Sequence, residues 1–268
     1  MAPWSDDRVW DAVDDWRWIP PGARRERTDE WDLAVTPGSY ALTYVYDFRV
    51  DDPRRTDERL LALQERIVAL GGTGARLQVT PRSRPADLPD RLARRGYRPR
   101  EDAEVLVFDL RDDRGGPRLP AFPEPEGIEV REVLSEADYR HFTRLGTEIF
   151  GDPAPSPETG SQFLSAFQEQ IRAVGHSDRF LAWDGPIPIG RGGLERAGPV
   201  ARLWGSGVLP NHRHRGAYGA IVRVRCRSVV DRGAEIALVI ARTGTSGPIL
   251  KRHGFRRVGA VSIWEIRF

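Results

Sequence analysis

Hydrophobic residues in the second half of the chain recur first at helical spacing and then in short extended runs. Phe142, Leu145 and Ile149 give a helical rhythm over 136–150, and a second apolar stripe runs through 157–174. Strands are predicted next, at 180–183, 187–194 and 201–209, with Asp184 and Gly185 in the first connecting turn. This order predicts two helices followed by an antiparallel meander.

The pattern then passes from the end of a strand into a basic, glycine-containing turn. A long helix is predicted over 217–231 and a continuous apolar strand over 234–240. A further helix ends at Arg252 and leads through Gly254 and Phe255 into a final strand. The last part of the chain is therefore predicted to form, in order, a strand, a turn, a helix, a strand, a helix and a strand.

The first half of the chain shows a similar succession. A helix at 57–70, a strand at 75–80 and a short helix lead into a strand at 103–110. Both halves end this succession on the pattern Leu-x-Arg-x-Gly-aromatic-Arg, which begins at Leu92 and at Leu250, and such repetition indicates duplication. The segment between the halves, rich in Pro, Gly and charge, predicts a linker without helix or strand. The predicted domains are 1–115 and 128–268, with the linker at 116–127.

The turn before the long helix is a candidate anion-binding site. Backbone N–H groups at the start of a helix lack intrahelical acceptors, and the helix dipole adds positive potential there. Arg213 and Arg215 add charge, and Gly216 allows the backbone to approach a phosphate closely. The corresponding helix of the first half has no glycine turn and follows Asp51 and Asp52, so a phosphate site is predicted in the second half only.

The same segment resembles the acyl-CoA-binding motif R/Q-x-x-G-x-G/A of the GNAT acyltransferase superfamily. Arg213 and Gly216 match it, Val208 and Pro210 match the V-x-P that closes the family's fourth strand, and the Gly254 pattern is similar to the family's last "GF" strand. The resemblance covers roughly 128–268. It implies an α+β fold of tandem GNAT-like domains, each a mixed central sheet flanked by helices, with a degenerate N-terminal copy.

The resemblance also implies where the co-substrate, acetyl-CoA, would bind. Backbone amides of the turn would take the pyrophosphate, and the edge of the preceding strand would hydrogen-bond the pantetheine amides. Gly205 and Gly207 indicate a bulge or a close backbone approach in that strand. The residues expected to bind acetyl-CoA are Ser206, Gly207, Val208, Arg213, His214, Arg215, Gly216, Ala217, Tyr218, Gly219, Ala220 and Thr243.

The sequence defines catalytic residues less well. Leu250 stands where many family members have a tyrosine that protonates the leaving thiolate, and leucine has no proton to donate. Ser246 or Thr243 could substitute, or could cap a helix instead. Glu195 and Glu148 are candidate general bases acting through water, although such residues are more often solvated surface acids.

Other residues of the motif region have two interpretations each. Tyr218 replaces the usual Gly or Ala, and we expect it to pack at the start of the helix. His212 and His214 could ligate a metal, but no third ligand lies near in sequence, so no metal is predicted. The helix arginines could reach the 3′-phosphate of the coenzyme or form a solvated face; they are Arg223, Arg225 and Arg227.

Composition narrows the class of protein. The net charge of +2 over 268 residues gives no electrostatic argument for nucleic-acid binding. The single cysteine, Cys226, cannot form an internal disulfide and favours a reducing compartment. No apolar run is long enough to cross a membrane, and the first ten residues lack an apolar signal core. We expect a cytoplasmic protein without nucleic-acid or membrane partners, and the oligomeric state is open.

The predicted activity is transfer of an acetyl group from acetyl-CoA to an amine of a small-molecule acceptor. The alternative is a catalytically silent acyl-CoA-binding protein, suggested by Leu250 and Tyr218. A third possibility, an aminoacyl-tRNA donor, would need a basic groove that the near-neutral charge disfavours. Acceptor specificity is expected from the helices at 136–150 and 157–174 and from the loop 151–158.

Overall fold

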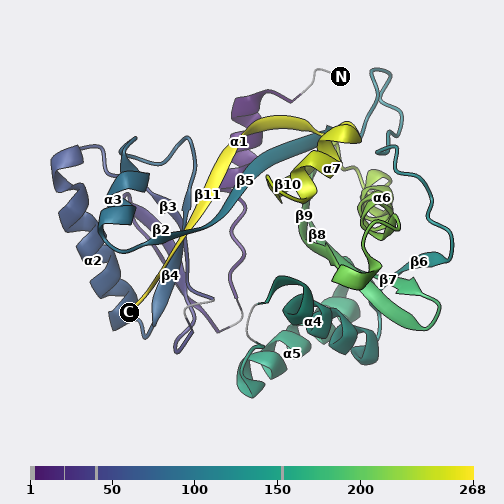
Figure 1. Ribbon diagram of the computed structural model, residues 1–268, viewed down its shortest axis with the longest axis horizontal. Helices are drawn as coiled ribbons and strands as arrows, with labels where there is room; N and C mark the ends of the chain where they lie inside the picture. The colour runs from purple at the N-terminus through teal and green to yellow at the C-terminus, as the bar shows by residue number, and fades with distance from the viewer. Residues whose placement is uncertain (1–3, 21, 40–41, 152–153) are drawn as a thin grey trace. The chain divides into compact units, whose positions relative to one another are not determined.

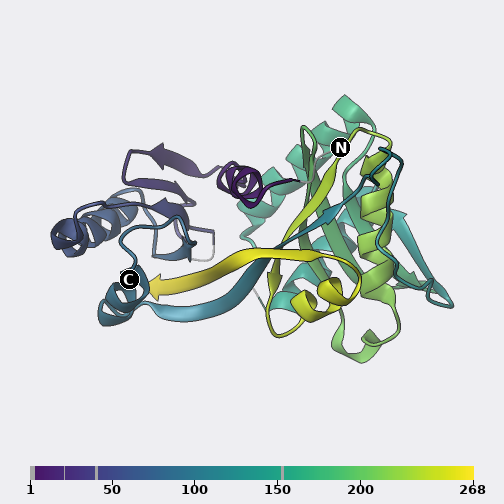
Figure 2. The same cartoon turned by 90° about the horizontal axis from the view of Figure 1, so that it is seen from above.

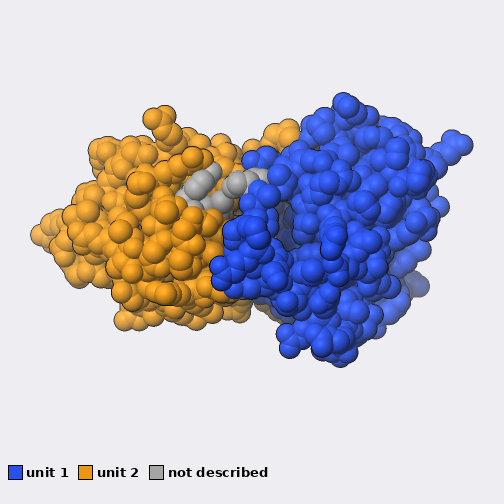
Figure 3. Space-filling view, turned by 90° about the horizontal axis from the view of Figure 1, so that it is seen from below, with its two compact units in different colours: residues 1–4, 106–240, 248–257 blue, residues 5–105, 241–247, 258–268 orange. Residues whose placement is uncertain are grey.

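The computed structural model describes residues 4–20, 22–39, 42–151 and 154–268 (Figures 1 and 2). They form two compact units that are interleaved in sequence (Figure 3). Unit 1 comprises Trp4, 106–240 and 248–257, and unit 2 comprises 5–105, 241–247 and 258–268. The segment 116–127 contains neither helix nor strand, as predicted, and lies within unit 1. Among the described residues, no helix is both long enough and apolar enough to span a membrane.

Unit 2 is built on a sheet with the strand order β1-β2-β3-β4-β11. Strands β3 and β4 are parallel, and the other neighbouring pairs are antiparallel. Leucine and isoleucine residues on α2 pack into one core with residues of β2, β3 and β4. Its elements are α1 (Asp6–Asp14), β1 (Arg24–Arg27), β2 (Trp31–Val35), β3 (Tyr44–Phe48), the 3₁₀ turn η1 (Pro53–Arg55), α2 (Thr56–Ala69), β4 (Gly74–Val79) and α3 (Leu88–Arg94).

Two long strands, β5 (Arg98–Asp109) and β11 (Arg256–Arg267), contribute residues to both units. In unit 1 the strand order is β5-β10-β9-β8-β7-β6, with β9 and β10 parallel. Its other elements are β6 (Ile128–Glu132), α4 (Glu136–Phe150), α5 (Pro157–Val174), β7 (Arg179–Asp184), β8 (Ile187–Ala197), β9 (Val200–Val208), the 3₁₀ turn η2 (Pro210–His212), α6 (Ala217–Val230), β10 (Ile236–Arg242) and α7 (Ser246–Arg252).

The two units repeat one arrangement of elements. In unit 2 the helix α2 connects the parallel strands β3 and β4, and in unit 1 the helix α6 connects the parallel strands β9 and β10. Each crossover is followed by a short helix, α3 or α7, and a long strand, β5 or β11. This succession matches the duplication predicted from the sequence.

Local signals explain why α4 and α5 begin and end where the sequence predicts. The hydroxyl of Ser135 accepts a hydrogen bond from the N–H of Asp138, and Gly151 ends α4 with a φ of 70°. Ser156 caps α5 in the same way, and Gly175 ends that helix with a φ of 73°. Ser caps and left-handed glycine ends are standard helix boundaries. Asp152 and Pro153, in the predicted acceptor loop, lie outside the described residues.

Glycines let the helices of unit 1 lie close against its sheet. Figure 1 shows α6 on one face of this sheet and α4 and α5 on the other. A Cβ at Gly192 of β8 would lie 2.7 Å from Cγ2 of Ile221 on α6. On the opposite face, a Cβ at Gly207 of β9 would overlap Ile149 of α4. Both faces of the β8–β9 ladder are therefore in direct contact with helices.

A buried arginine joins α6 to the same strands. Arg225 is 1% exposed, and its Nη1 donates to the carbonyl oxygen of Gly193 at 2.7 Å and of Trp204 at 3.4 Å. Its Nε donates to the carbonyl of Ile221 within the helix at 3.2 Å. Burial lowers the pKa of Arg225 to about 10. The guanidinium is therefore stabilised by carbonyl oxygens of β8, β9 and its own helix.

We expect Gly192→Ala to lower the free energy of unfolding by about 1–3 kcal/mol, because the added methyl group must displace Ile221 from a packed interface. Chemical denaturation measures this change. Gly160→Ala is the control: it lies in α5, its Cβ would meet no atom closer than 4.0 Å, and alanine is the better helix former. Equal stability of Gly192→Ala and the wild type would contradict the close packing of α6 on β8.

Candidate functional site

The turn between β9 and α6 has the geometry of an anion-binding loop. Arg213 closes it by donating from Nε to the carbonyl of Val208 at 3.2 Å. His214 and Gly216 have left-handed backbone conformations, with φ of 62° and 83°. α6 begins directly after Gly216 with no side-chain cap. The first N–H groups of this helix therefore have no intrahelical or capping acceptor and suit a phosphate.

The left-handed conformation of His214 was not foreseen from the sequence. A non-glycine residue there is strained by about 1–2 kcal/mol, because its Cβ crowds the following carbonyl oxygen. Strain of this kind is typical of ligand-binding loops. Glycine positions could be read from the sequence, whereas no local signal marks a histidine for this conformation.

Part of the positive charge of the turn is neutralised by Asp184 at the end of β7. The guanidinium of Arg215 contacts both carboxylate oxygens of Asp184, with Nη2 and Oδ1 3.2 Å apart. Nδ1 of His212 lies 3.6 Å from Oδ2 of the same carboxylate. Arg215 is the main reason that the pKa of Asp184 is lowered. The sequence indicated Asp184 only as a turn residue and missed this role.

The C-terminal half of β9 has an unpaired edge next to this turn. Residues 200–203 of β9 pair with 236–239 of β10, and the pairing stops there. Residues 204–207 are half-buried, whereas 200–203 are buried. A strand edge without a partner can hydrogen-bond an added extended ligand through its backbone groups. This is the strand edge at which the family resemblance implied binding of the pantetheine amides.

A bulge lies in this part of β9, as predicted. Gly193 of β8 pairs with Trp204, and Arg191 of β8 pairs with Gly207. The register therefore advances by three residues along β9 and by only two along β8, which leaves one extra residue in β9. Gly205 within the bulge has a φ of 57°. Ser206 points to the α6 face, where its Oγ lies 3.1 Å from the position of a Cβ at Gly192. Tyr218 packs against a core cluster that includes Val208 and Ile189, as expected.

The segment 116–127 borders the turn, which the sequence did not indicate. A Cβ at Gly216 would lie 2.9 Å from Cβ of Pro125, and one at Gly219 would lie 2.5 Å from the ring of Phe122. Glu124 forms an ion pair with Arg223 of α6 at 2.8 Å. These contacts hold the segment along α6, and Arg227 lines a groove between the two.

The arginines of α6 have separate roles. Arg225 is buried, so the interpretation that it could bind a 3′-phosphate is wrong. Arg223 is paired with Glu124, and Arg227 is exposed. His253 is structural, since its Nδ1 lies 3.0 Å from the carbonyl oxygen of Ala121 and its ring packs on Phe122.

The candidate catalytic residues do not gather at the turn. Glu195 lies opposite Arg202 on the fully paired part of the ladder, with Oε1 3.5 Å from Nη1 of that arginine. Glu148 is exposed on α4 and pairs with Arg144 at 2.8 Å. Leu250 is fully buried in unit 1. Catalytic roles for Glu195 and Glu148 therefore stay predictions.

Thr243 and Ser246 belong to unit 2, and the turn belongs to unit 1. The hydroxyl of Thr243 donates to the carbonyl of Asp102 at 3.1 Å, and that of Ser246 accepts from the N–H of Arg242 at 3.1 Å. Both hydroxyls thus have local backbone partners. A role for either in binding acetyl-CoA or in proton transfer stays a prediction.

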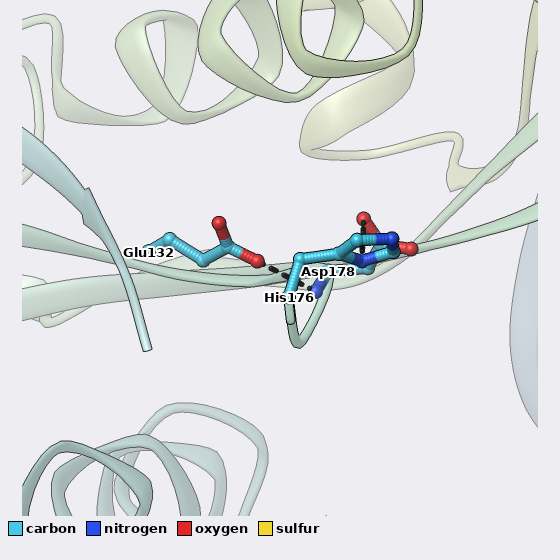
Figure 4. Close-up of side chains that lie close together, drawn as sticks. All are labelled: Glu132, His176 and Asp178. Atoms are coloured by element: carbon cyan, nitrogen blue, oxygen red, sulfur yellow. Dashed lines mark hydrogen bonds and ion pairs between the residues drawn. The ribbon is translucent and has the colours of Figure 1, made fainter. Parts of the chain in front are cut away.

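A group of possible metal ligands lies elsewhere in unit 1 (Figure 4). Glu132, His176 and Asp178 place one ligand atom each within 4.8 Å of one another. Arg232 already supplies a cation there, donating to Asp178 at 2.6 Å and lying 3.0 Å from Nε2 of His176. Oε1 of Glu132 accepts from the N–H groups of residues 177 and 178. The group is therefore explained as a structural network.

The chain is similar in sequence and in fold to several N-acetyltransferases. No family model matches the chain. The sequence is 28% identical over 95 residues to a curated Bacillus subtilis protein named uncharacterized N-acetyltransferase YjcF. The matched segment covers 35% of this chain and 67% of the relative. A GCN5-related N-acetyltransferase from Kribbella flavida has a TM-score of 0.63 at 15% identity, covering 91% of this chain and 89% of that one.

Two further structures have the same fold over nearly the whole chain. A GCN5-related N-acetyltransferase from Sphaerobacter thermophilus gives a TM-score of 0.61 at 19% identity, covering 96% of this chain and 85% of that one. A tandem GNAT protein from the clavulanic acid biosynthesis pathway gives 0.57 at 15% identity, covering 100% and 90%. The chain has the α+β fold of tandem GNAT proteins. Part of its sequence is similar to a curated N-acetyltransferase.

We expect Asp184→Asn to tighten the binding of inorganic pyrophosphate several-fold at low salt, because Arg215 loses its competing carboxylate. The pKa of Asp184 is lowered below its ordinary 3.8, so the carboxylate stays charged at pH 5 and only the substitution removes it. Isothermal titration at two salt concentrations measures the effect. Asp231→Asn, at the opposite end of α6, is the control and should bind as the wild type does.

Proposed function

We propose that this protein transfers an acetyl group from acetyl-CoA to an amine of a small-molecule acceptor. The observation that supports this best is the unpaired edge of β9, which leads through a left-handed turn into the uncapped start of α6. The backbone of residues 206–208 would hold the pantetheine, and the N–H groups of 216–219 would hold the pyrophosphate, since that of Ala220 already donates to the carbonyl of Gly216. We propose the cytoplasm as its compartment, since its single cysteine is a free buried thiol.

The reaction needs little covalent chemistry from the protein. The lone pair of a neutral amine attacks the thioester carbonyl carbon, the C–N bond forms as the C–S bond breaks, and the amine proton ends on the CoA sulfur. Holding both reactants in contact can supply most of the rate. A thiol with a pKa near 8.5, as in free cysteine, is a tolerable leaving group without a general acid. The buried Leu250 is therefore compatible with slow to moderate catalysis.

A silent acyl-CoA-binding protein is the second candidate. It is favoured by Leu250 at the usual tyrosine position and by the local backbone partners of Thr243 and Ser246. Release of one equivalent of free thiol, in single turnover with a panel of amines, separates the two candidates. Thiol release with formation of an N-acetyl product supports the transferase, and binding without thiol release supports the silent protein.

We expect acetyl-CoA to raise the melting temperature of the wild type and to have no such effect on Gly216→Glu. A glutamate at this position places a negative charge where the pyrophosphate would bind. The measurement is a thermal-shift titration up to millimolar acetyl-CoA.

Gly233→Glu is the matched control, because Gly233 lies just beyond the other end of α6 and has a similar φ of 89°. Both variants therefore place the same side chain on a left-handed backbone position. The melting temperatures without ligand report on folding: Gly216 also contacts Pro125, so that variant is expected to melt lower. Equal ligand shifts in both variants, or no shift in the wild type, would rule out this donor site.

A further inference from the structure

Two arginines lie among aromatic rings on the α4 face of unit 1, opposite the face that α6 covers. Cζ of Arg191, on β8, lies 3.6 Å from the ring centre of Phe142. Arg179, on β7, lies over the rings of Tyr139, Phe167 and Trp204 at 5.8–6.0 Å. The two cations sit beneath α4 and α5, the helices expected from the sequence to line the acceptor site.

The charge of Arg191 has no carboxylate partner among the described residues. The charged group that acts on it most is Arg179, a second cation, and burial together with that cation lowers the pKa of Arg191 to about 9. Arg179 donates to Oε1 of Gln170 and to the carbonyl of Ser177, both at 2.8 Å. The nearby Asp178 is paired with Arg232. The pair of arginines thus carries excess positive charge in a half-buried, aromatic environment.

The hydrogen bonds of Arg191 are also incomplete. Its Nη1 donates to the carbonyl of Phe142 at 2.8 Å. Its Nε is buried and has no hydrogen-bond partner in the part of the chain that the structure describes. A buried donor without a partner costs about 1–3 kcal/mol, so a ligand that accepts its hydrogen bond would be favoured. Nε and Nη2 form one edge of the planar guanidinium, the edge that binds a carboxylate in two parallel hydrogen bonds.

The position of this guanidinium connects it to the proposed donor site. Nη2 of Arg191 lies 3.1 Å from the position of a Cβ at Gly205, so a side chain there would be in tight contact with it. Gly205 is the left-handed residue of the β9 bulge, and the unpaired edge of β9 begins at that bulge. The side chain of Arg191 therefore extends over the strand that would hold the pantetheine arm.

We propose that Arg191 binds a carboxylate of the acyl acceptor and that the acceptor is an amino-acid-like amine. This inference rests on the proposed function. Arg191 would hold the acceptor with its amine beside the acetyl thioester, and Arg179 would add positive potential while keeping its own hydrogen bonds. Aromatic rings around the guanidinium limit its hydration, which strengthens a charge-assisted hydrogen bond.

The test compares the steady-state kinetics of L-amino acids with those of the matching L-amino-acid amides, at saturating acetyl-CoA. We expect the wild type to prefer the carboxylates. In Arg191→Gln, KM for the carboxylates should rise about 10- to 100-fold, as expected for a charge-assisted hydrogen bond worth 1.5–3 kcal/mol. KM for the amides and for acetyl-CoA should not change. Arg191→Lys, which keeps the charge, should recover part of the loss.

Arg196→Gln is the matched control, because Arg196 is exposed on the same strand and should leave all constants unchanged. The apparent melting temperatures of the variants show whether they fold. The inference would be overturned if the wild type acetylated L-amino-acid amides as efficiently as L-amino acids. It would also be overturned if Arg191→Gln raised KM equally for the amides and for the amino acids. If the wild type preferred aminoalkyl phosphates to amino acids, the proposal that Arg191 binds a carboxylate would be overturned.

Two results separate this inference from the proposed function. If acetyl-CoA raises the melting temperature but carboxylates and amides behave alike, the donor site stands and the acceptor assignment fails. If acetyl-CoA neither binds nor reacts, the proposed function fails and this inference fails with it.

Discussion

The buried guanidinium of Arg225 is the interaction on which the rest of unit 1 depends. It leaves α6 and reaches carbonyl oxygens of Gly193 and Trp204, on two strands whose register shifts at that point. A buried charge is costly unless its hydrogen bonds are made, and a shift of α6 away from the bulge would leave this cation only the carbonyl of Ile221 on its own helix. The same contact therefore fixes both the turn at the start of α6 and the unpaired edge of β9.

Arg225 and Arg191 show how one residue type can serve packing in one place and recognition in another. Arg225 points to the α6 face and bonds to carbonyls through both Nε and Nη1. Arg191 points to the α4 face, bonds to one carbonyl through Nη1, and has a buried Nε for which the described residues offer no acceptor. The difference lies in the hydrogen bonds, since burial lowers the pKa of both. An incomplete set beside a strand bulge is what a polar ligand would complete.

The anion-binding turn is shaped by residues distant from it in the sequence. Asp184, in the β7–β8 hairpin, holds Arg215, and Pro125 and Phe122 pack against glycines of the turn and helix. The proline-rich segment is thus packed against the turn and the start of α6 in unit 1. Because Asp184 reduces the positive charge of the turn, backbone N–H groups and the helix dipole would carry more of the phosphate binding.

The sequence by itself determined the elements and their order. Helical spacing placed α4 and α5, and glycines at 205 and 207 indicated the bulge, because these signals act over a few neighbouring residues. It also carried the resemblance to the GNAT superfamily, through a motif contained in one turn. Only the tertiary structure decided that Arg225 is buried, that Asp184 pairs with Arg215 and that Arg191 lies over Gly205. These depend on which faces of distant strands and helices meet, and no local pattern in the sequence encodes that pairing.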